Sequence, residues 1–337
     1  MNEANNDIEE KPKLYDINDG LKESLVCVID ILGYKKFMTY DNKQEGNRKL
    51  SLLKETFEKA LRYAKKKSQS GDFPKCYLKS YTDNILIACP LEVNIPFPRQ
   101  YRTFDFIISS LQDQFLIYGL LVRGACDIGE IYVDEDFVFG ASLIEAHKLE
   151  SKIAKYPRIV LSNKLVDKFK QIYQSPNPPF YQTAWDEYDF ATNSNKKFLL
   201  KSNGIYFLNH LQFYELPDIE ADEDYLKDYC LFAEHKKFII KKTQSILSNN
   251  KPDENVIIKY LWLATYHNYF LNDLINRSQD YSGGNCLVDI ESLFGNEWKE
   301  YSEKHPDFKF KDFMGIKRLS PNTSKYFFKT TYIKKDK

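Results

Sequence analysis

The sequence predicts an α+β fold in which a sheet is covered by helices. Three observations predict it: a continuous apolar run at residues 25–32, two short apolar runs on either side of a polar turn, and helical apolar spacing between these segments. A continuous run of this length is typical of a strand buried on both faces, whereas apolar residues three or four apart indicate a helix. The resulting order, β-α-ββ-α-β, is that of a split βαβ unit, which builds a sheet with its helices on one face.

The elements follow in order along the first half of the chain. After the strand at residues 25–32, apolar residues at helical spacing predict a helix over residues 44–66. Residues 76–81 and 85–89 are β-type runs, and the Thr82-Asp83-Asn84 segment between them suits a tight hairpin turn. The remaining predicted elements are a helix at residues 104–118, strands at 120–126 and 129–133, a short helix from 143 to 150 and a strand at 158–161.

The pattern changes beyond residue 162. Residues 175–197 are rich in Pro, Asn, Tyr and Asp and are expected to form a long loop or insertion, and residues 204–208 form a predicted strand. Two long predicted helices, at residues 223–249 and 253–273, are separated by the breaker Asn249-Asn250-Lys251-Pro252. We therefore divide the chain into a flexible arm (1–22), an α+β domain (23–215), a helical extension (216–281) and a C-terminal tail of unknown role (282–337).

The composition excludes several classes of function. Lys plus Arg and Asp plus Glu both number 48, so there is no basic excess to hold a nucleic-acid backbone. No run approaches the roughly 18 apolar residues of a membrane helix, and no signal-peptide core is found. The six cysteines form no CxxC pair, and Cys27, Cys89 and Cys126 lie in apolar runs, where buried reduced thiols are expected. We expect a soluble cytoplasmic protein that requires neither nucleic acid nor a membrane.

Two carboxylates stand where a charge is costly. Asp30 lies inside the apolar run of the first strand, and Asp83 lies at the tip of the hairpin. In a β-α-ββ sheet the first strand and the hairpin are neighbours, so both side chains can converge at one edge. A buried carboxylate needs a compensating partner, the nearby sequence offers no obvious Arg for Asp30, and a hard divalent cation would serve. The alternative is an aspartate at the surface edge beside an ordinary turn aspartate.

The segment after Asp30 favours the cation. Residues 32–37 lead from the strand end through Gly33 into a short turn. Backbone N–H groups at such a turn can hold phosphate oxygens. Together with the two carboxylates, this turn describes a site for a metal and a triphosphate.

Four segments together resemble a class III nucleotide cyclase domain: VIDILGYKKF, KSYTDNILIA, LVRGACDIGEIY and FVFGASLIEAHKLE. They are most similar to the pyrimidine cyclases of the bacterial anti-phage group known as Pycsar. The similarity covers about residues 24–210, in the order and at the spacing of the family. It implies a ferredoxin-like, palm-type domain that forms a head-to-tail homodimer with its active sites at the interface.

The resemblance implies roles for individual residues. Asp30 and Asp83 take the two metal-ligand positions, where they would hold two Mg²⁺ or Mn²⁺ ions with the carbonyl of Ile31 as a further ligand. The phosphate-holding turn would be formed by Leu32, Gly33, Tyr34, Lys35, Lys36 and Phe37.

Three lysines match further positions of the family. Lys79, four residues before Asp83, falls where purine cyclases carry a base-reading Lys or Glu. Lys148 falls where the family usually has a transition-state Arg, which the resemblance places in the partner chain. Lys201 would stand for a later triphosphate-binding Lys.

Two positions depart from the family pattern. The family Asn four residues before the transition-state Arg is Ile144 here, and the base-reading Asp is Phe137. Lys79 offers only hydrogen-bond donors and therefore favours a base with a carbonyl acceptor, which adenine lacks. Phe137, with Tyr34 and Tyr81, would narrow the pocket against either purine. The sequence predicts UTP as the first substrate and CTP as the second.

The expected function is conversion of a pyrimidine nucleoside triphosphate to its 3′,5′-cyclic monophosphate and pyrophosphate by two-metal chemistry. The resemblance implies a second messenger in anti-phage defence that activates a separate effector protein. The alternatives are a catalytically silent cyclase-like module that binds a nucleotide or a partner, a purine (adenylate or guanylate) cyclase, and a polymerase-like enzyme. The polymerase alternative is disfavoured because the hairpin reads TDN rather than GGDD.

Several of these residues also have purely structural interpretations. Lys148 is consistent with a solvated helix face, and Arg123 is expected to pair with a carboxylate near the sheet. The aromatic stripe around Trp262 predicts core or dimer contact. Four histidines lack the spacing of metal ligands and are expected to be structural: His147, His210, His235 and His267.

Overall fold

The computed structural model describes residues 14–68, 75–173, 199–213, 231–277 and 286–312. These residues contain a nine-stranded sheet in the order β2-β3-β1-β4-β6-β8-β7-β9, with β5 paired to β4. The strands are β1 (Lys22–Leu32), β2 (Tyr77–Tyr81), β3 (Asn84–Pro90), β4 (Leu121–Val133), β5 (Val138–Phe139), β6 (Ile159–Leu161), β7 (Leu199–Ser202), β8 (Ile205–Leu208) and β9 (Phe310–Asp312). The α-helices are α1 (Tyr34–Phe37), α2 (Lys43–Ser68), α3 (Phe97–Ile117), α4 (Ala141–Lys152), α5 (Asn163–Tyr173), α8 (Leu231–Leu247), α9 (Glu254–Arg277), α10 (Ile290–Phe294) and α11 (Asn296–Lys304).

The first four strands have the ferredoxin-like arrangement. β2, β3, β1 and β4 lie side by side, and each neighbouring pair is antiparallel. Helices α1 and α2 connect β1 to β2, and α3 connects β3 to β4. The predicted α+β class and the split βαβ order are therefore confirmed.

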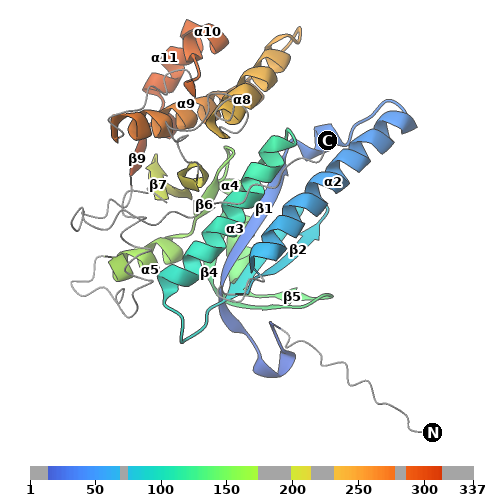
Figure 1. Cartoon of the computed structure of the whole chain (residues 1–337), viewed down its shortest axis with the longest axis vertical. Coiled ribbons are helices and arrows are strands. Elements are labelled where there is room, and N and C mark those ends of the chain that lie inside the picture. Colours follow the sequence, from blue (N-terminus) through green and yellow to red (C-terminus); the bar gives the residue numbers. More distant parts are fainter. Residues whose placement is uncertain (1–13, 69–74, 174–198, 214–230, 278–285, 313–337) are drawn as a thin grey trace, which may run out of the picture.

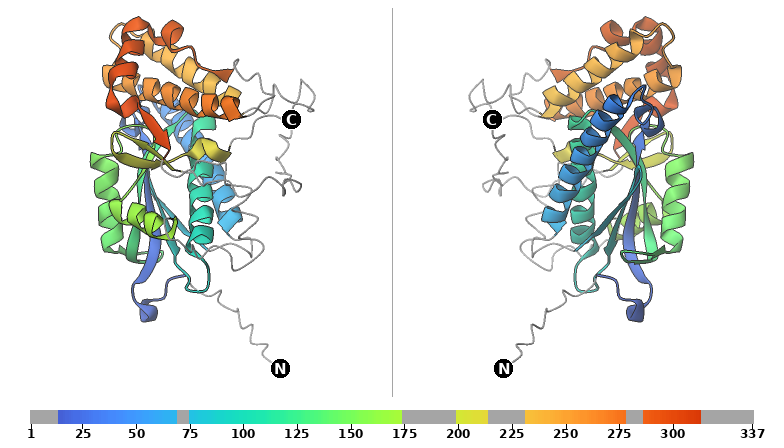
Figure 2. Two further views of the ribbon diagram at one scale, coloured as in Figure 1. Left: turned by 90° about the vertical axis from the view of Figure 1, so that its left-hand side faces the viewer. Right: turned by 90° about the vertical axis from the view of Figure 1, so that its right-hand side faces the viewer.

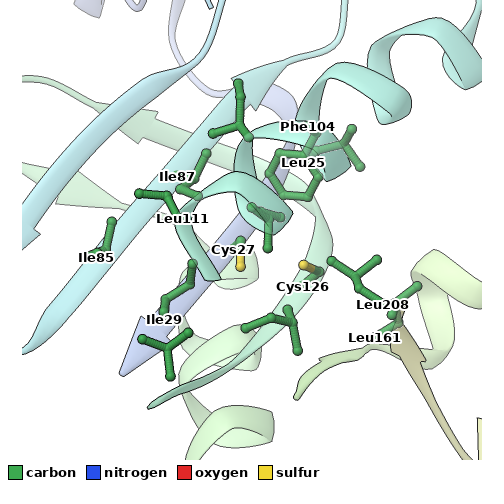
Figure 3. Packing of buried hydrophobic residues seen from close by; sticks show 14 of the residues in the cluster. Leu25, Cys27, Ile29, Ile85, Ile87, Phe104, Leu111, Cys126, Leu161 and Leu208 are labelled. Atoms are coloured by element: carbon green, nitrogen blue, oxygen red, sulfur yellow. The ribbon is translucent and has the colours of Figure 1, made fainter. Parts of the chain in front are cut away.

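Helices cover both faces of this sheet, where the sequence predicted one. Side chains alternate between the faces of a strand, so Cys27 and Ile29 of β1 join the core beneath α2, α3 and α5. Figure 3 shows both in one cluster with Phe104 and Leu111 of α3. Val26 and Val28 face the other side, where Ala146 of α4 covers them. Figure 2 shows α4 on one side of the sheet and α2 and α3 on the other. Burial on both faces explains why β1 is a continuous apolar run.

Strand β4 is one element where the sequence predicted two. It runs through Asp127 without a break and pairs with β1 from Leu32↔Leu121 to Lys22↔Ile131. The Asp127 carboxylate is buried but accepts a hydrogen bond from the Ser162 hydroxyl. A satisfied polar group can remain inside a strand, so this aspartate does not mark a turn.

Cysteine pairing differs from the expectation at one position. Cys27 and Cys126 are buried free thiols, as predicted. Cys89 instead forms a disulfide with Cys76. The register Tyr77↔Ala88 between β2 and β3 places the two cysteines opposite each other, with their Cα atoms 4.2 Å apart, so the prediction of a reduced Cys89 is wrong.

The terminal and insertion segments are described in part. Of the arm expected over residues 1–22, residues 1–13 lie outside the described residues, whereas Tyr15 is buried and its hydroxyl is 2.9 Å from that of Ser24. The loop expected at residues 175–197 lies wholly outside them. Of the tail expected at 282–337, residues 286–312 form α10, α11 and β9, and β9 pairs with β7.

The helical extension is built on an aromatic core. Trp262 is fully buried and stacks on Tyr156 and Tyr266, with ring centres 5.5 and 5.3 Å away. The predicted core role of this stripe is confirmed. Arg158 is buried against the same rings, and its guanidinium carbon Cζ lies 5.6 Å from the centre of the Trp262 ring. Burial lowers the pKa of Arg158 to about 10. No helix among the described residues combines the length and the apolar character needed to cross a membrane.

Three histidines that are distant in sequence meet inside this region. The Nδ1 atoms of His235 and His267 are 2.8 Å apart, and Nε2 of His267 is 2.9 Å from the carbonyl of Cys286. Because a carbonyl only accepts, His267 carries its proton on Nε2 and accepts at Nδ1 from His235. The His210 ring centre lies 6.0 Å from that of His235. Burial lowers the pKa of His210 to about 3 and that of His267 to about 4.

Acidification is therefore expected to destabilise the fold. The ordinary pKa of a histidine side chain is 6.5, so the unfolded chain binds protons below that pH while the folded histidines stay neutral. As the pH is lowered below 6.5, the free energy of unfolding then decreases by up to about 1.4 kcal/mol per pH unit for each histidine. Urea midpoints at about pH 7 and about pH 5 would show the loss. A His267→Gln variant should have a shallower pH dependence than wild type, and an unchanged slope would contradict this account.

Candidate active site

Asp30 and Asp83 lie together where β1 ends. Asp30 is paired in register with Asn84, and the backbone N–H of Ile31 donates to the carbonyl of Asp83 at 3.3 Å. The Asp83 carboxylate accepts from the Thr82 hydroxyl at 2.8 Å. The hairpin thus brings the second carboxylate to the first, as its position in a split βαβ sheet predicts.

The Asp30 carboxylate has an arginine partner. Arg123 stands opposite Asp30 in the β1–β4 register and donates from Nε to Oδ2 at 2.9 Å. Its Nη2 atom lies 2.8 Å from Oε1 of Glu150, which α4 brings to the same face. The arginine partner of Asp30 comes from 93 residues along the chain and not from the nearby sequence, and the expected pairing of Arg123 with a carboxylate is confirmed. Glu150 was not among the candidate residues, and only the packing of α4 on β1 and β4 reveals its contact with Arg123.

The cluster holds more acidic groups than cations. Burial raises the pKa of Asp30, Arg123 opposes this effect, and the nearby Asp83 carboxylate raises the pKa further. Burial also raises the pKa of Glu150, against the pull of Arg123. Asp30 and Glu150 thus share one guanidinium, with the Asp83 carboxyl group nearby, and a further cation would relieve the repulsion among the three carboxylates.

The two aspartates at the end of β1 fit a hard cation such as Mg²⁺, which takes its remaining ligands from water and the substrate. Within the described ranges, no group of three or more His, Cys, Asp or Glu side chains is arranged to hold a metal ion. Mg²⁺ is usually held by one or two carboxylates together with substrate phosphates and water. Asp30 and Asp83 supply two carboxylates of this kind, and the backbone carbonyl of Ile31, the next residue of β1 after Asp30, is the further ligand that the sequence predicts.

The expected phosphate turn is a tight connection. Gly33 has φ +80°, a left-handed conformation that favours glycine, and it lets the chain pass from β1 directly into α1. Tyr34 and Phe37 pack on the core beneath α2 and α3, while Leu32 packs on the core of the extension. The Lys35 side chain is exposed, and the side chain of Lys36 lies outside the described part. Phosphate binding by residues 32–37 stays a prediction.

Lys79 lies on the same sheet face as Asp30, because Leu86, its partner in the register, faces α4 with Val28. Its Nζ atom donates to the carbonyls of Asp134, at 3.1 Å, and Glu135. Asp134 and Glu135 belong to the turn between β4 and β5. The same turn carries Phe137, whose backbone N–H donates to the Asp134 carboxylate at 2.6 Å. The structure thus brings Lys79 and the Phe137 turn together. The Phe137 ring itself is 55% exposed and stacks on Phe139.

Lys148 and Lys201 do not join the two aspartates within one chain. The Lys148 side chain is 57% exposed and lies 3.3 Å from Glu145, and Ile144 on the same helix is 71% exposed. Lys201 is on β7, four strands away from β1, which corresponds to about 19 Å at the usual strand spacing. Its Nζ atom donates to the Tyr206 hydroxyl at 3.1 Å.

Comparison with known proteins finds no matching protein-family model and no matching curated protein. Two of the solved structures that match show the extent of the similarity. The adenylyl cyclase CyaB from P. aeruginosa is 13% identical, with a TM-score of 0.37 over 45% of this chain and 82% of that chain. A class III adenylyl cyclase-like ATP-binding protein from Pseudomonas aeruginosa is 11% identical, with a TM-score of 0.35 over 76% of this chain and 71% of that chain. Likeness at this level does not identify an activity.

Proposed function

We propose that this chain is a nucleotide cyclase that converts a pyrimidine nucleoside triphosphate, UTP before CTP, to its 3′,5′-cyclic monophosphate and pyrophosphate. The observation that carries the proposal is the meeting of Asp30 and Asp83 at the end of β1, beside a turn made by Gly33. Carboxylates beside a backbone turn are the combination that metal-assisted chemistry on a triphosphate requires.

Each part of the site has a task in this reaction. Mg²⁺ or Mn²⁺ held by Asp30, Asp83 and the Ile31 carbonyl would lower the pKa of the ribose 3′-hydroxyl and neutralise charge on the α-phosphate. Arg123 fixes the orientation of Asp30 through its 2.9 Å hydrogen bond. The backbone of residues 32–37 would receive the phosphates. Lys148 of a second copy would offset charge in the transition state.

Base choice depends on Lys79 and Phe137. Lys79 donates to two backbone carbonyls in this structure, so its surroundings already present it with the acceptor type that uracil offers at O2 and O4. A base carbonyl can replace these acceptors without leaving the ammonium unpaired. Phe137 cannot accept a hydrogen bond from the amino group of adenine. A site that leaves polar groups of the base unpaired rejects that base strongly.

The proposal extends to assembly and signalling. On the resemblance of residues 24–210, the enzyme acts as a homodimer in the cytoplasm, and its product activates a separate effector in anti-phage defence. One observation favours a second candidate function, in which the chain binds a nucleotide but has no catalytic activity. Arg123 already neutralises Asp30, as it would in a purely structural ion pair.

Product analysis separates these functions. Purified protein is incubated with each of the four ribonucleoside triphosphates and Mg²⁺ or Mn²⁺, and the products are identified by mass. We expect cyclic UMP first and cyclic CMP second. A preference for ATP or GTP would contradict the base assignment alone, and binding without product would favour the silent module. An Asp83→Ala preparation made in parallel excludes a contaminating cyclase.

A further inference from the structure

We propose that Glu150, on helix α4, is a positioning residue of the metal site: it offsets the charge of Arg123, so that Asp30 can bind a divalent cation while the same arginine holds it. This inference rests on the proposed function and deepens it, because Glu150 has no role among the residues predicted from the sequence. It explains how an aspartate that already has an arginine partner can still hold a metal ion.

Each nitrogen of the Arg123 guanidinium faces a different acceptor. Nε donates to Oδ2 of Asp30 at 2.9 Å, and Nη1 donates to the carbonyl of Ala154 at 3.4 Å. Nη2 lies 2.8 Å from Oε1 of Glu150. Strands β1 and β4, which carry Asp30 and Arg123, run side by side (Figure 1), and α4 brings Glu150 from the sheet face opposite α2 and α3 (Figure 2). The guanidinium is therefore held in one orientation by acceptors from three different segments.

The arginine alone would weaken a metal site at Asp30. Arg123 bonds Oδ2 of Asp30, and a carboxylate has a second oxygen with which it can hold a cation. However, a positive charge at hydrogen-bond distance cancels most of the attraction that the carboxylate exerts on a second cation. Without a further carboxylate, the pair of Asp30 and Arg123 would be neutral.

Glu150 restores negative charge to this pair. Its side chain is only 8% exposed, so its charge acts through protein rather than through water and is weakly screened by salt. When ionised, Asp30 and Glu150 together with Arg123 carry one negative charge, and Asp83 adds a second. The total equals in size the charge of one Mg²⁺ or Mn²⁺ ion.

A purely structural ion pair is the competing explanation. A carboxylate that is buried for stability alone is usually hydrogen-bonded. Oε1 of Glu150 is enclosed by protein, and among the described residues its 2.8 Å contact with Arg123 is an ion pair without the alignment of a hydrogen bond. Buried ion pairs contribute little net stability, so this contact is better explained by the charge that it sets at Asp30.

Binding of Mn²⁺ alone, followed by loss of the EPR signal of the free ion, tests the proposal. Glu150→Gln keeps the shape of the side chain and removes its charge, so Mn²⁺ affinity should fall about 10-fold or more. The double variant Arg123→Gln/Glu150→Gln removes both opposite charges, and its affinity should return to within about 3-fold of wild type. This rescue separates charge compensation from a structural role, for which the second substitution only adds damage.

Asp127→Asn is the matched control. Asp127 is also a buried carboxylate, but it lies four residues from Arg123 along β4 and accepts a hydrogen bond from Ser162. Four residues correspond to about 13 Å along a strand, so this substitution should change Mn²⁺ affinity less than about 2-fold. Urea midpoints show whether each variant is folded at the temperature of the titration.

The outcomes separate this proposal from the proposed function. Unchanged Mn²⁺ affinity in Glu150→Gln, an equal effect of Asp127→Asn, or a double variant that binds no more tightly than Glu150→Gln would overturn the role of Glu150. If the wild-type chain forms cyclic nucleotide despite such a result, the cyclase stands. Asp83→Ala should abolish Mn²⁺ binding. If the wild-type chain binds Mn²⁺ no better than Asp83→Ala does, the metal site is wrong and both proposals fall.

Discussion

An Asp83→Ala variant is expected to form no detectable cyclic nucleotide while its sheet remains folded. Asp83 lies at a hairpin tip, where its carboxylate interacts with its neighbours Thr82 and Asn84. Its removal therefore costs little packing. The several kcal/mol that a bound metal supplies to a transition state correspond to a loss of about 10³-fold or more in kcat, at one factor of ten per 1.4 kcal/mol.

Asp30→Ala should have the same effect on turnover for the same reason. Arg123 loses one partner in this variant but keeps Glu150, whose Oε1 is 2.8 Å away, so no isolated charge remains. Initial rates with UTP and Mn²⁺, together with urea midpoints, measure the two effects separately. Asp127→Asn is the matched control, because Asp127 is a buried aspartate on β4 that contacts Ser162 instead. Near-normal product formation by Asp30→Ala or Asp83→Ala would refute the two-metal assignment.

The meeting of Asp30 and Asp83 could be predicted because it depends on local order. A hairpin that follows a βα unit in a split βαβ sheet returns beside the first strand, which brings a carboxylate at the hairpin tip to the strand that carries the other. The partner of Asp30 could not be found in this way. Arg123 is 93 residues away, and only the β1–β4 register, which packing of the whole sheet fixes, sets the two opposite each other.

The errors in the elements have similar causes. The sequence predicts two strands, at residues 120–126 and 129–133, on either side of Asp127 and Ile128, but a tertiary hydrogen bond from Ser162 satisfies the Asp127 carboxylate within one strand. Cys89 is interpreted from its apolar neighbours alone, although its pairing with Cys76 depends on the β2–β3 register.

The position of Lys148 leads to a test of assembly. Glu150 on α4 points toward Arg123 and Asp30, and residues two apart on a helix point in nearly opposite directions. Lys148 therefore faces away from the aspartates of its own chain, as its exposure indicates. If this lysine acts in catalysis, it acts in the site of a second copy.

Mixing Asp83→Ala with Lys148→Ala chains should therefore restore activity that neither variant has alone. In a head-to-tail heterodimer, one site loses both residues and the other keeps both. Random exchange makes about half of the dimers heterodimers, so about a quarter of wild-type activity is expected. Native mass spectrometry measures the exchange, and initial rates with UTP measure the recovery. If heterodimers form and no activity returns, Lys148 does not act across the interface, and its exposed ammonium near Glu145 is simply part of a solvated helix face.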